Sequence, residues 1–433
     1  METQVELYPL KERVKIAALA VFGSYVEWYD YFIAATAAAL VWSDVFFSAY
    51  PYLSTAFSIA AFGVAYFTRP VGAYIFGHIG DKYGRKSSLI YTLLTVSVAM
   101  FGISVLPSAN SIGVIAPILL FVFRAIQGIG FGGEYGGAAT WVLETNAYSK
   151  LRATWTSLTM AVIGLGSGTG AALYYYLSTH FSRADLLNFW WRVPFFIGVV
   201  LIISAAIIRY FALESNLFVK LQKVGKVLKN PANVAIKTHI GLMLLIATTW
   251  LYIFWVNPAT IQLFATPYLA KMGISRTYVT YTLIISNFII PFTTIFGGFL
   301  SDLIGRRTTI VISALSVAIF IYPYIILLQS GNLFNILIAQ IILNALAFIG
   351  EGSFTAYFPE LFRTQFRYTG SGVSYQFTAM YMGFVYSFLL PAILLSGNPT
   401  IYVIIVTIVF CGLSMLIRLR LWQETVKSDI SHV

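Results

Sequence analysis

Long apolar stretches separated by short polar connectors make up almost the whole chain. A membrane-spanning helix needs about 20 predominantly apolar residues. Apolar stretches of about that length or more occur at 16–41, 52–77, 88–106, 112–143, 154–177, 190–213, 238–269, 278–300, 308–328, 333–358, 368–395 and 401–421. They are too long, and alternate too little, for the strands of a β-barrel. The pattern predicts an all-α polytopic membrane protein with about twelve transmembrane helices.

A polar stretch at 214–237 separates the first six apolar stretches from the last six. We therefore expect an N-terminal six-helix bundle over 1–213, a cytoplasmic linker over 214–237 and a C-terminal six-helix bundle over 238–433. Lysines recur at every third position in the linker, at 220, 223, 226 and 229. Such a charge run is typical of a solvated linker or a surface helix.

The composition agrees with lipid as the solvent for much of the chain. Hydrophobic residues account for 59% of the 433 positions and charged residues for 10%, with a mean hydropathy of +0.81. Soluble domains carry about 25% charged residues. Four scattered histidines and one cysteine, Cys411, provide no metal-ligand spacing. We therefore predict no metal, no cofactor and no enzyme active site.

The distribution of lysine and arginine sets the expected orientation. If the N-terminus is cytoplasmic, most basic connector residues fall inside, and the outside keeps Arg183, Arg192, Lys271 and Arg276. By the positive-inside rule, both termini are then cytoplasmic. The net charge of +11 follows this topology rather than forming one patch. We therefore expect a plasma-membrane protein embedded in the bilayer, not a nucleic-acid binder.

A short motif occurs once in each half of the chain. Gly77–Lys86 reads GHIGDKYGRK, and Gly298–Arg307 reads GFLSDLIGRR. Nearly the same spacing links three further pairs: Pro70 with Pro291, Glu134 with Glu351, and Glu144 with Glu360. Matched features in one chain order indicate two six-helix halves related as parallel repeats, with a transport path between them.

Each copy of the motif lies where an even-numbered helix ends and the next begins. We expect the two aspartates to satisfy helix N-termini or arginines, and the two arginines to reach glutamates on the same side. The hypothesis is a cytoplasmic latch that holds one access state. The alternative is a static loop with surface ion pairs worth about 0–1 kcal/mol each. The latch set comprises Asp81, Arg85, Glu144, Arg152, Asp302, Arg306, Glu360 and Arg367.

These motifs resemble those of the major facilitator superfamily, over essentially the whole chain. The metabolite:proton symporter branch, with its carriers of oxoglutarate, citrate, shikimate and proline or betaine, is the most similar. The segments that carry this resemblance are Val26–Asp30, Arg69–Gly72, Arg124–Gly128, Gly132–Gly136, Trp191–Phe195 and Pro359–Phe362. The resemblance implies proton-coupled symport of a small solute by alternating access, and we expect the carrier to act as a monomer.

Six ionisable residues lie inside the apolar stretches, where each charge costs about 2.5–3.5 kcal/mol on insertion scales. Such residues are expected to face the interior and to pair with one another. A rise of about 1.5 Å per residue places two of them near the midplane and at least two in a lower layer, which Glu27 is a candidate to join. The two near the midplane are Asp30 and Arg124, and the two in the lower layer are Arg69 and Glu134. Glu27 and Glu351 complete the six.

A proton switch is expected on the first helix. Glu27 and Asp30 are three residues apart and share one helix face. Two carboxylates so close cannot easily both ionise unless a cation lies beside them. The resemblance to sugar-porter proton symporters implies that Asp30 accepts the proton and pairs with Arg124; the alternative is a purely structural buried pair.

Polar and aromatic side chains inside the second half are candidates for solute binding. An arginine, Arg69 or Arg124, offers bidentate contacts to a carboxylate, whereas Glu27, Glu134 or Glu351 offers a partner for an amine. We favour a small organic acid; the alternatives are a zwitterion such as proline or betaine, a sugar, or a sensor that binds solute without moving it. The candidates are Arg69, Gln127, Glu134, Trp255, Asn257, Gln262, Asn287, Glu351, Tyr375 and Gln376.

Overall fold

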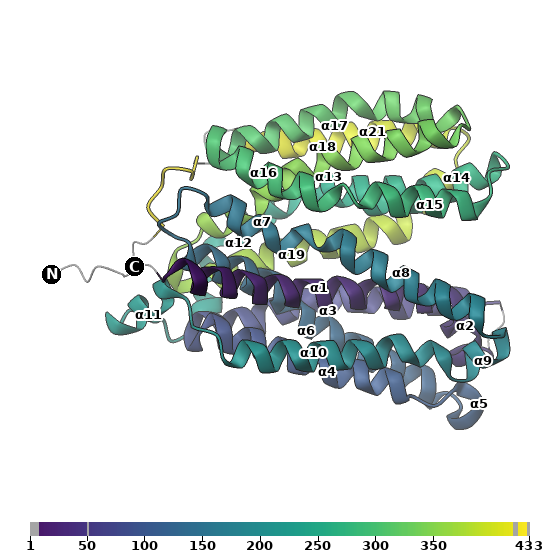
Figure 1. Ribbon diagram of the computed structural model, residues 1–433, viewed down its shortest axis with the longest axis horizontal. Coiled ribbons are helices and arrows are strands. Elements are labelled where there is room, and N and C mark those ends of the chain that lie inside the picture. The colour runs from purple at the N-terminus through teal and green to yellow at the C-terminus, as the bar shows by residue number, and fades with distance from the viewer. Residues whose placement is uncertain (1–7, 50–51, 419–422, 431–433) are drawn as a thin grey trace.

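The computed structural model describes residues 8–49, 52–418 and 423–430, which form helices running side by side (Figure 1). Within these ranges no strand occurs. Nine of the helical segments described are long and apolar enough to cross a membrane, and α21 (Pro399–Met415) is a shorter apolar helix. With α1 (Leu10–Leu40) and the segment that begins at Arg367, they account for the twelve predicted helices. The predicted all-α class is confirmed.

Six spanning segments form the first half of the molecule. They are α1, α3 (Ser54–Tyr83), α4 (Arg85–Val105), α6 (Ile115–Thr145), α7 with α8 (Arg152–Ala161 and Ile163–His180) and α10 (Val193–Tyr210). Short helices lie in the connections: α2 (Trp42–Phe46), α5 (Ala109–Ile112), α9 (Arg183–Asn188) and the 3-10 turn Trp190–Arg192. Each spanning segment overlaps one predicted apolar stretch.

Six more segments form the second half. The first combines α12 (Pro231–Thr249), α13 (Leu251–Phe254), a π-helical stretch η2 (Trp255–Phe264) and α14 (Ala265–Lys271). Next come α15 with α16 (Arg276–Asn287 and Ile290–Ile304), α17 (Arg306–Gln329) and α18 (Leu333–Glu360). The 3-10 turn Thr364–Phe366 precedes α19 (Arg367–Phe384), which continues through the π-helical η4 (Val385–Leu389) into α20 (Leu390–Leu395). A 3-10 turn, Leu416–Arg418, follows α21.

The connection between the halves is shorter than expected. It contains the surface helix α11 (Asn216–Lys223), as the lysine spacing allowed, but α12 already begins at Pro231, inside the predicted linker. Proline is well suited to the first position of a helix. The polar residues before 238 suggested that the helix begins there. In the structure, the helix also includes these polar residues, and Lys237 lies on an exposed face of it.

Glycines let helices within each half approach closely. A Cβ on Gly132 of α6 would lie 2.1 Å from the carbonyl oxygen of Arg69 on α3. In the second half, a Cβ on Gly352 of α18 would lie 2.0 Å from the carbonyl oxygen of Thr294 on α16. No side chain fits at such distances, so these small residues set equivalent helix crossings in both halves.

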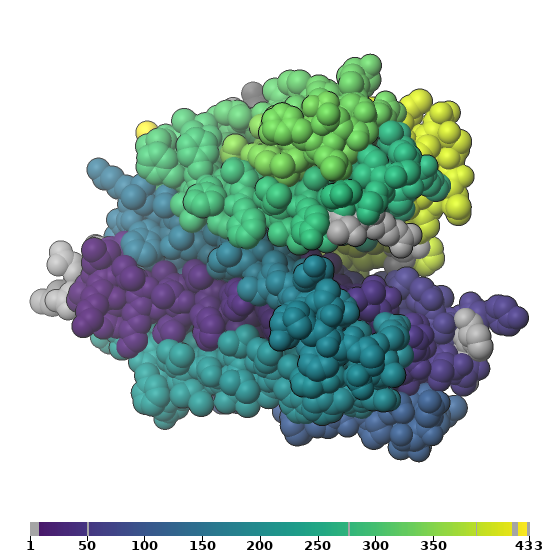
Figure 2. Space-filling view, turned by 45° about the vertical axis from the view of Figure 1, so that its right-hand side comes forward, coloured from purple at the N-terminus to yellow at the C-terminus, as the bar shows by residue number. Residues whose placement is uncertain are grey.

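The two copies of the sequence motif lie where the halves meet. Helix α3 packs on α19, and α16 packs on α7. A Cβ on Gly77 would lie 2.7 Å from Thr369 Cα, and one on Gly298 would lie 2.7 Å from the Ala153 carbonyl oxygen. We call this end of the molecule, at which α1 begins and α11 lies, the charged end (Figure 1). Towards the opposite end, the surface between the halves is hollowed (Figure 2).

Candidate functional site

Glu27 of α1 and Arg69 of α3 form a buried ion pair. Arg69 Nη1 donates to Glu27 Oε1 at 2.9 Å. The guanidinium also lies over the rings of Tyr66 and Phe131, 5.5 and 5.7 Å from their centroids. Glu27 Oε2 and Arg69 Nε are buried without a hydrogen-bond partner. The pair agrees with the lower layer expected from helix rise, and both members keep a buried polar atom that is unpaired.

Asp30 and Arg124 are joined through a third side chain rather than directly. Gln127 Nε2 donates to Asp30 Oδ1 at 2.6 Å, and Gln127 Oε1 accepts a hydrogen bond from Arg124 Nη1. Arg124 also donates to the carbonyl oxygens of Ala61 and Phe62 on α3. The expected direct ion pair is therefore wrong for this conformation. These carbonyl groups hold the guanidinium against α3, and Gln127, one turn further along α6, fills the gap.

Glu134 pairs with an arginine that the sequence analysis passed over. Arg209 of α10 donates to Glu134 Oε1 at 2.5 Å and to Oε2 at 3.0 Å, and Thr92 donates to Oε2 at 3.1 Å. A Cβ on Gly23 would lie 1.7 Å from Arg209 Nη2, so glycine leaves the room for this guanidinium. Glu134 is thus neutralised inside the first half by Arg209, whereas Arg69 pairs with Glu27.

A narrow cavity of about 40 Å³ lies between the halves. Its walls come from α1 and α8 of the first half and from α13, η2, α18 and α19 of the second. The lining residues are Trp28, Tyr31, Phe32, Ile163, Ile253, Phe254, Asn257, Pro258, Gln262, Phe348, Glu351 and Tyr375. Four predicted solute-binding candidates line it: Asn257, Gln262, Glu351 and Tyr375. A site between two repeats is where such folds place a transported solute.

The π-helical stretch η2 organises the amides of the cavity wall. Gln262 Nε2 donates to Asn257 Oδ1 at 2.9 Å, a contact between residues five apart that matches the π-helical repeat. Asn257 Nδ2 donates in turn to Asn344 Oδ1 at 2.7 Å and to Asn287 Oδ1 at 3.3 Å. Asn287 therefore lies behind the lining and orients Asn257.

The remaining solute-binding candidates lie outside the cavity lining. Trp255 turns towards α21, where its indole donates to Thr407 at 2.8 Å and stacks edge-on against Phe410. Gln376 crosses to the first half and donates to the Gly132 carbonyl oxygen at 3.2 Å. The rotation of each helix decides these positions, and a sequence of apolar and aromatic residues on all faces leaves that rotation open. Arg69, Gln127 and Glu134 are engaged in the contacts described above.

At the charged end, the aspartate of each motif caps a helix of the other half. Asp81 accepts hydrogen bonds from the N–H groups of Tyr368 and Thr369, at the start of α19, at 3.1 and 2.9 Å. Asp302 accepts from the N–H groups of Ala153 and Thr154 of α7 at 3.0 and 2.9 Å. A carboxylate at a helix N-terminus satisfies free donors and the helix dipole. Both caps tie the halves together.

The arginines and glutamates of the latch set form two matching clusters. Arg85 reaches Asp81 at 3.0 Å and Glu144 at 2.9 Å, and Arg367 of the other half reaches Glu144 at 3.1 Å. The second cluster repeats these contacts at 2.7–3.1 Å with Asp302, Arg306, Glu360 and Arg152. The side chains are at most 7% exposed. The expected contacts are confirmed, and surface ion pairs are excluded.

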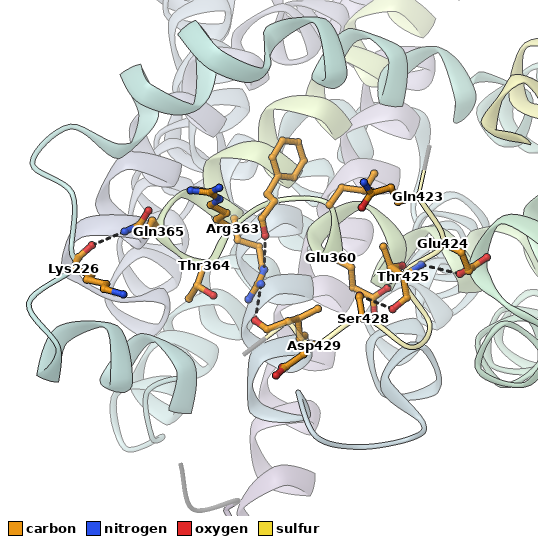
Figure 3. Close-up of a pocket in the computed structure, with 14 residues that line it drawn as sticks. Lys226, Glu360, Arg363, Thr364, Gln365, Gln423, Glu424, Thr425, Ser428 and Asp429 are labelled. Atoms are coloured by element: carbon orange, nitrogen blue, oxygen red, sulfur yellow. Dashed lines mark hydrogen bonds between the residues drawn. The ribbon is translucent and has the colours of Figure 1, made fainter. Parts of the chain in front are cut away.

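The segment 423–430 packs against the second cluster (Figure 3) and also contacts Arg367 of the first cluster. Arg152 donates to the carbonyl oxygens of Thr425 and Ser428 at 2.9 and 3.0 Å, and Arg367 donates to that of Ile430 at 3.1 Å. The Thr425 hydroxyl donates to Glu360. This segment follows the last helix of the second half but contacts Arg152 of the first half, so it adds to the joint between them.

Comparisons with known proteins agree with this architecture. Residues 16–228 match the family described as Sugar (and other) transporter. The inner membrane metabolite transport protein YhjE of Escherichia coli K12 is 34% identical over 87% of this chain and 86% of that protein. The shikimate transporter of the same organism is 31% identical over 89% and 90%. The proton:xylose symporter XylE, bound to 6-bromo-6-deoxy-D-glucose, superposes with a TM-score of 0.77 at 16% identity, covering 96% and 97%.

The chain belongs to the major facilitator superfamily. It is therefore a multi-pass membrane transporter and not an enzyme, as the repeated motif indicated. The family resemblance stated from the sequence is confirmed by relatives that match nearly its whole length.

The transporter also contains a repeated feature that the sequence analysis missed. Glu214 accepts hydrogen bonds from the N–H groups of Arg85 and Lys86, and Glu424 accepts from those of Arg306 and Arg307. Burial raises the pKa of the Glu214 carboxyl, although the Ser215 N–H and Arg85 act in the opposite direction. The signal was present as Glu-Ser and Glu-Thr, one pair after the sixth apolar stretch and the other after the twelfth.

Proposed function

We propose that this transporter is a proton symporter of a small organic carboxylate, with Asp30 as the proton acceptor. Its charged end faces the cytoplasm, as the distribution of lysine and arginine supports. The conformation described is then closed on the cytoplasmic side, and the solute enters from the opposite side. The alternatives weighed from the sequence, a sugar or a zwitterion as the solute, concern the solute and leave the proton site unchanged.

The arrangement of α1 carries this proposal. Glu27 and Asp30 contact α3 and α6, and Trp28 and Tyr31, on the adjoining part of the helix surface, lie in the cavity wall. A proton on Asp30 neutralises the carboxylate to which Gln127 donates, so the link from Asp30 through Gln127 to Arg124 weakens. Because the same helix lines the cavity, solute binding and proton binding act on one rigid element.

Arg69 provides the cation for the carboxylate. It lies behind the cavity wall: its guanidinium covers Tyr66, and the Tyr66 ring meets that of Tyr31 edge-on with centroids 6.0 Å apart. Its Nε has no partner in this conformation. A proton on Glu27 would release the remaining guanidinium N–H groups for bidentate contact with the solute.

The test is the Asp30→Asn variant in proteoliposomes with an imposed pH gradient. We expect proton-driven solute accumulation to be lost, while exchange of labelled solute across the membrane continues, because the amide keeps the shape but binds no proton. The exposed pair Asp44–Arg183, 2.6 Å apart, offers a matched control in Asp44→Asn, which should accumulate solute normally. Full proton-driven accumulation by the Asp30→Asn variant contradicts the proposal.

A further inference from the structure

Glu351 is the single charged residue that lines the cavity, among the residues described. Glu351 Oε2 accepts a hydrogen bond from the Trp250 indole at 2.6 Å, and Glu351 is 2% exposed. Within the same described ranges, no ion pair includes it. Its counterpart in the sequence repeat, Glu134, is fully neutralised by Arg209. The two halves therefore differ at this position.

A buried carboxylate without a cation is costly, because desolvation of the charge is not repaid by a partner. Intramembrane charges usually pair with one another for this reason. An ionised carboxylate has about four acceptor positions, and the Trp250 indole occupies one. Since the protein supplies no cation at Glu351, its charge is relieved either by a proton or by a cationic group that enters from the cavity that Glu351 lines.

The walls of the cavity restrict what this group can be. Six of the twelve lining residues are aromatic: Trp28, Tyr31, Phe32, Phe254, Phe348 and Tyr375. Aromatic faces attract organic cations, with a contribution of about 2 kcal/mol when the site is desolvated. A metal ion would need several anionic or nitrogen ligands, and the part of the chain described has no cluster of three such residues. One carboxylate among aromatic rings suits an alkylated nitrogen cation.

We propose that Glu351 and the aromatic walls form a subsite for a cationic nitrogen of the transported solute. The solute then carries two charged groups, an ammonium at α18 and a carboxylate directed towards Arg69 on α3. This assignment rests on the proposed symport of a carboxylate and narrows it to a zwitterion. Binding would draw α18 of one half and α1 and α3 of the other onto a single small molecule.

The contribution of the positive charge to binding can be measured with two ligands of nearly the same shape, of which one carries the charge. Glycine betaine carries a trimethylammonium group, and 3,3-dimethylbutanoate carries a tert-butyl group in its place on the same carboxylate. By titration calorimetry on the purified transporter, we expect glycine betaine to bind at least about tenfold more tightly. Equal affinities, or no binding of glycine betaine at millimolar concentrations, would overturn the proposal.

Variants of Glu351 test whether the carboxylate causes the preference. Glu351→Gln keeps a hydrogen-bonding side chain and should lose the preference for glycine betaine without affecting binding of 3,3-dimethylbutanoate. Glu351→Asp keeps the charge and should keep the preference, with weaker affinity; this variant also shows that the site tolerates substitution. If Glu351→Gln retains the preference, Glu351 serves another role, such as holding a proton, and the assignment is wrong.

These binding measurements need no pH gradient, so they separate the subsite from proton coupling. The Asp30→Asn variant should retain the preference for glycine betaine even though it no longer accumulates solute. If Asp30→Asn accumulates solute normally while the Glu351 variants behave as expected, the assignment of Asp30 as the proton acceptor fails and the subsite stands. If instead Asp30→Asn loses accumulation but the Glu351 variants do not behave as expected, the subsite is wrong and the role of Asp30 in symport stands.

Discussion

Three buried acidic residues of the first half are neutralised in different ways. Glu134 is held by two hydrogen bonds from Arg209, Glu27 by one from Arg69, and Asp30 by the neutral amide of Gln127. The strength of compensation therefore falls from Glu134 to Asp30. A group that exchanges protons during transport has to be the weakly compensated one, because a fully paired carboxylate stays ionised. Among these three residues, the ranking supports the proposed role of Asp30 as the proton site and suggests a structural role for Glu134.

The structural role of the Glu134–Arg209 pair can be tested on its own. Arg209→Met leaves a buried carboxylate without its partner, and we expect a loss of about 3–5 kcal/mol in the free energy of unfolding in mixed micelles. Arg209→Met combined with Glu134→Gln should recover much of that loss. The control Arg183→Met breaks an exposed pair and should change stability by less than about 1 kcal/mol. A loss no greater than this control in Arg209→Met would contradict the assignment.

At the charged end, helices α7 and α19 each depend on a residue of the other half for their N-terminal cap. Each begins beneath an aspartate of the other half, so the cap exists only while the halves are together there. Each glutamate, Glu144 or Glu360, then joins arginines of both halves. Separation of the halves at this end would expose the helix N-termini and the arginines together. We therefore expect the contacts to act as one cooperative latch, not as independent ion pairs.

Asp81→Asn should weaken this latch and shift the transporter towards the state that is open at the charged end. Thr140 lies 3.3 Å from Ser371 across the interface of the halves, and both are buried. A cysteine at Thr140, with Cys411 replaced by serine, should then react faster with a water-soluble maleimide. Asp185→Asn, on the exposed α9, is the control. An unchanged labelling rate in Asp81→Asn would show that Asp81 does not hold this end closed.

At the level of elements, the sequence predicted more of the latch than of the cavity. The latch occurs twice, so Asp81 and Asp302 could be found by comparing the halves. The cavity occurs once, and its lining depends on helix rotation. Trp255 and Asn257 are two residues apart and therefore point to opposite sides of η2, one to Thr407 and the other to the cavity. Arg209 was overlooked because it lies at the end of an apolar stretch, where a basic residue is ordinary.

Over the whole molecule, the two repeats share a frame but differ in their chemistry. The latch clusters and the close glycine contacts occur in both halves, so the halves are built as similar bundles around a shared interface. The ion pairs around Glu27 and Glu134 lie in the first half, whereas the carboxylate facing the cavity, Glu351, lies in the second. With Asp30 as the proposed proton acceptor, proton binding would belong to the first half, whereas residues of both halves line the cavity.

The most direct measurement of the central claim is solute accumulation by the wild-type transporter in proteoliposomes. The solute is chosen by binding, the lumen is made alkaline relative to the outside, and uptake is followed until it stops. The account predicts accumulation above the outside concentration that collapses when a protonophore removes the pH gradient. Uptake that stops at equal concentrations on both sides, with or without the protonophore, would contradict proton-coupled symport.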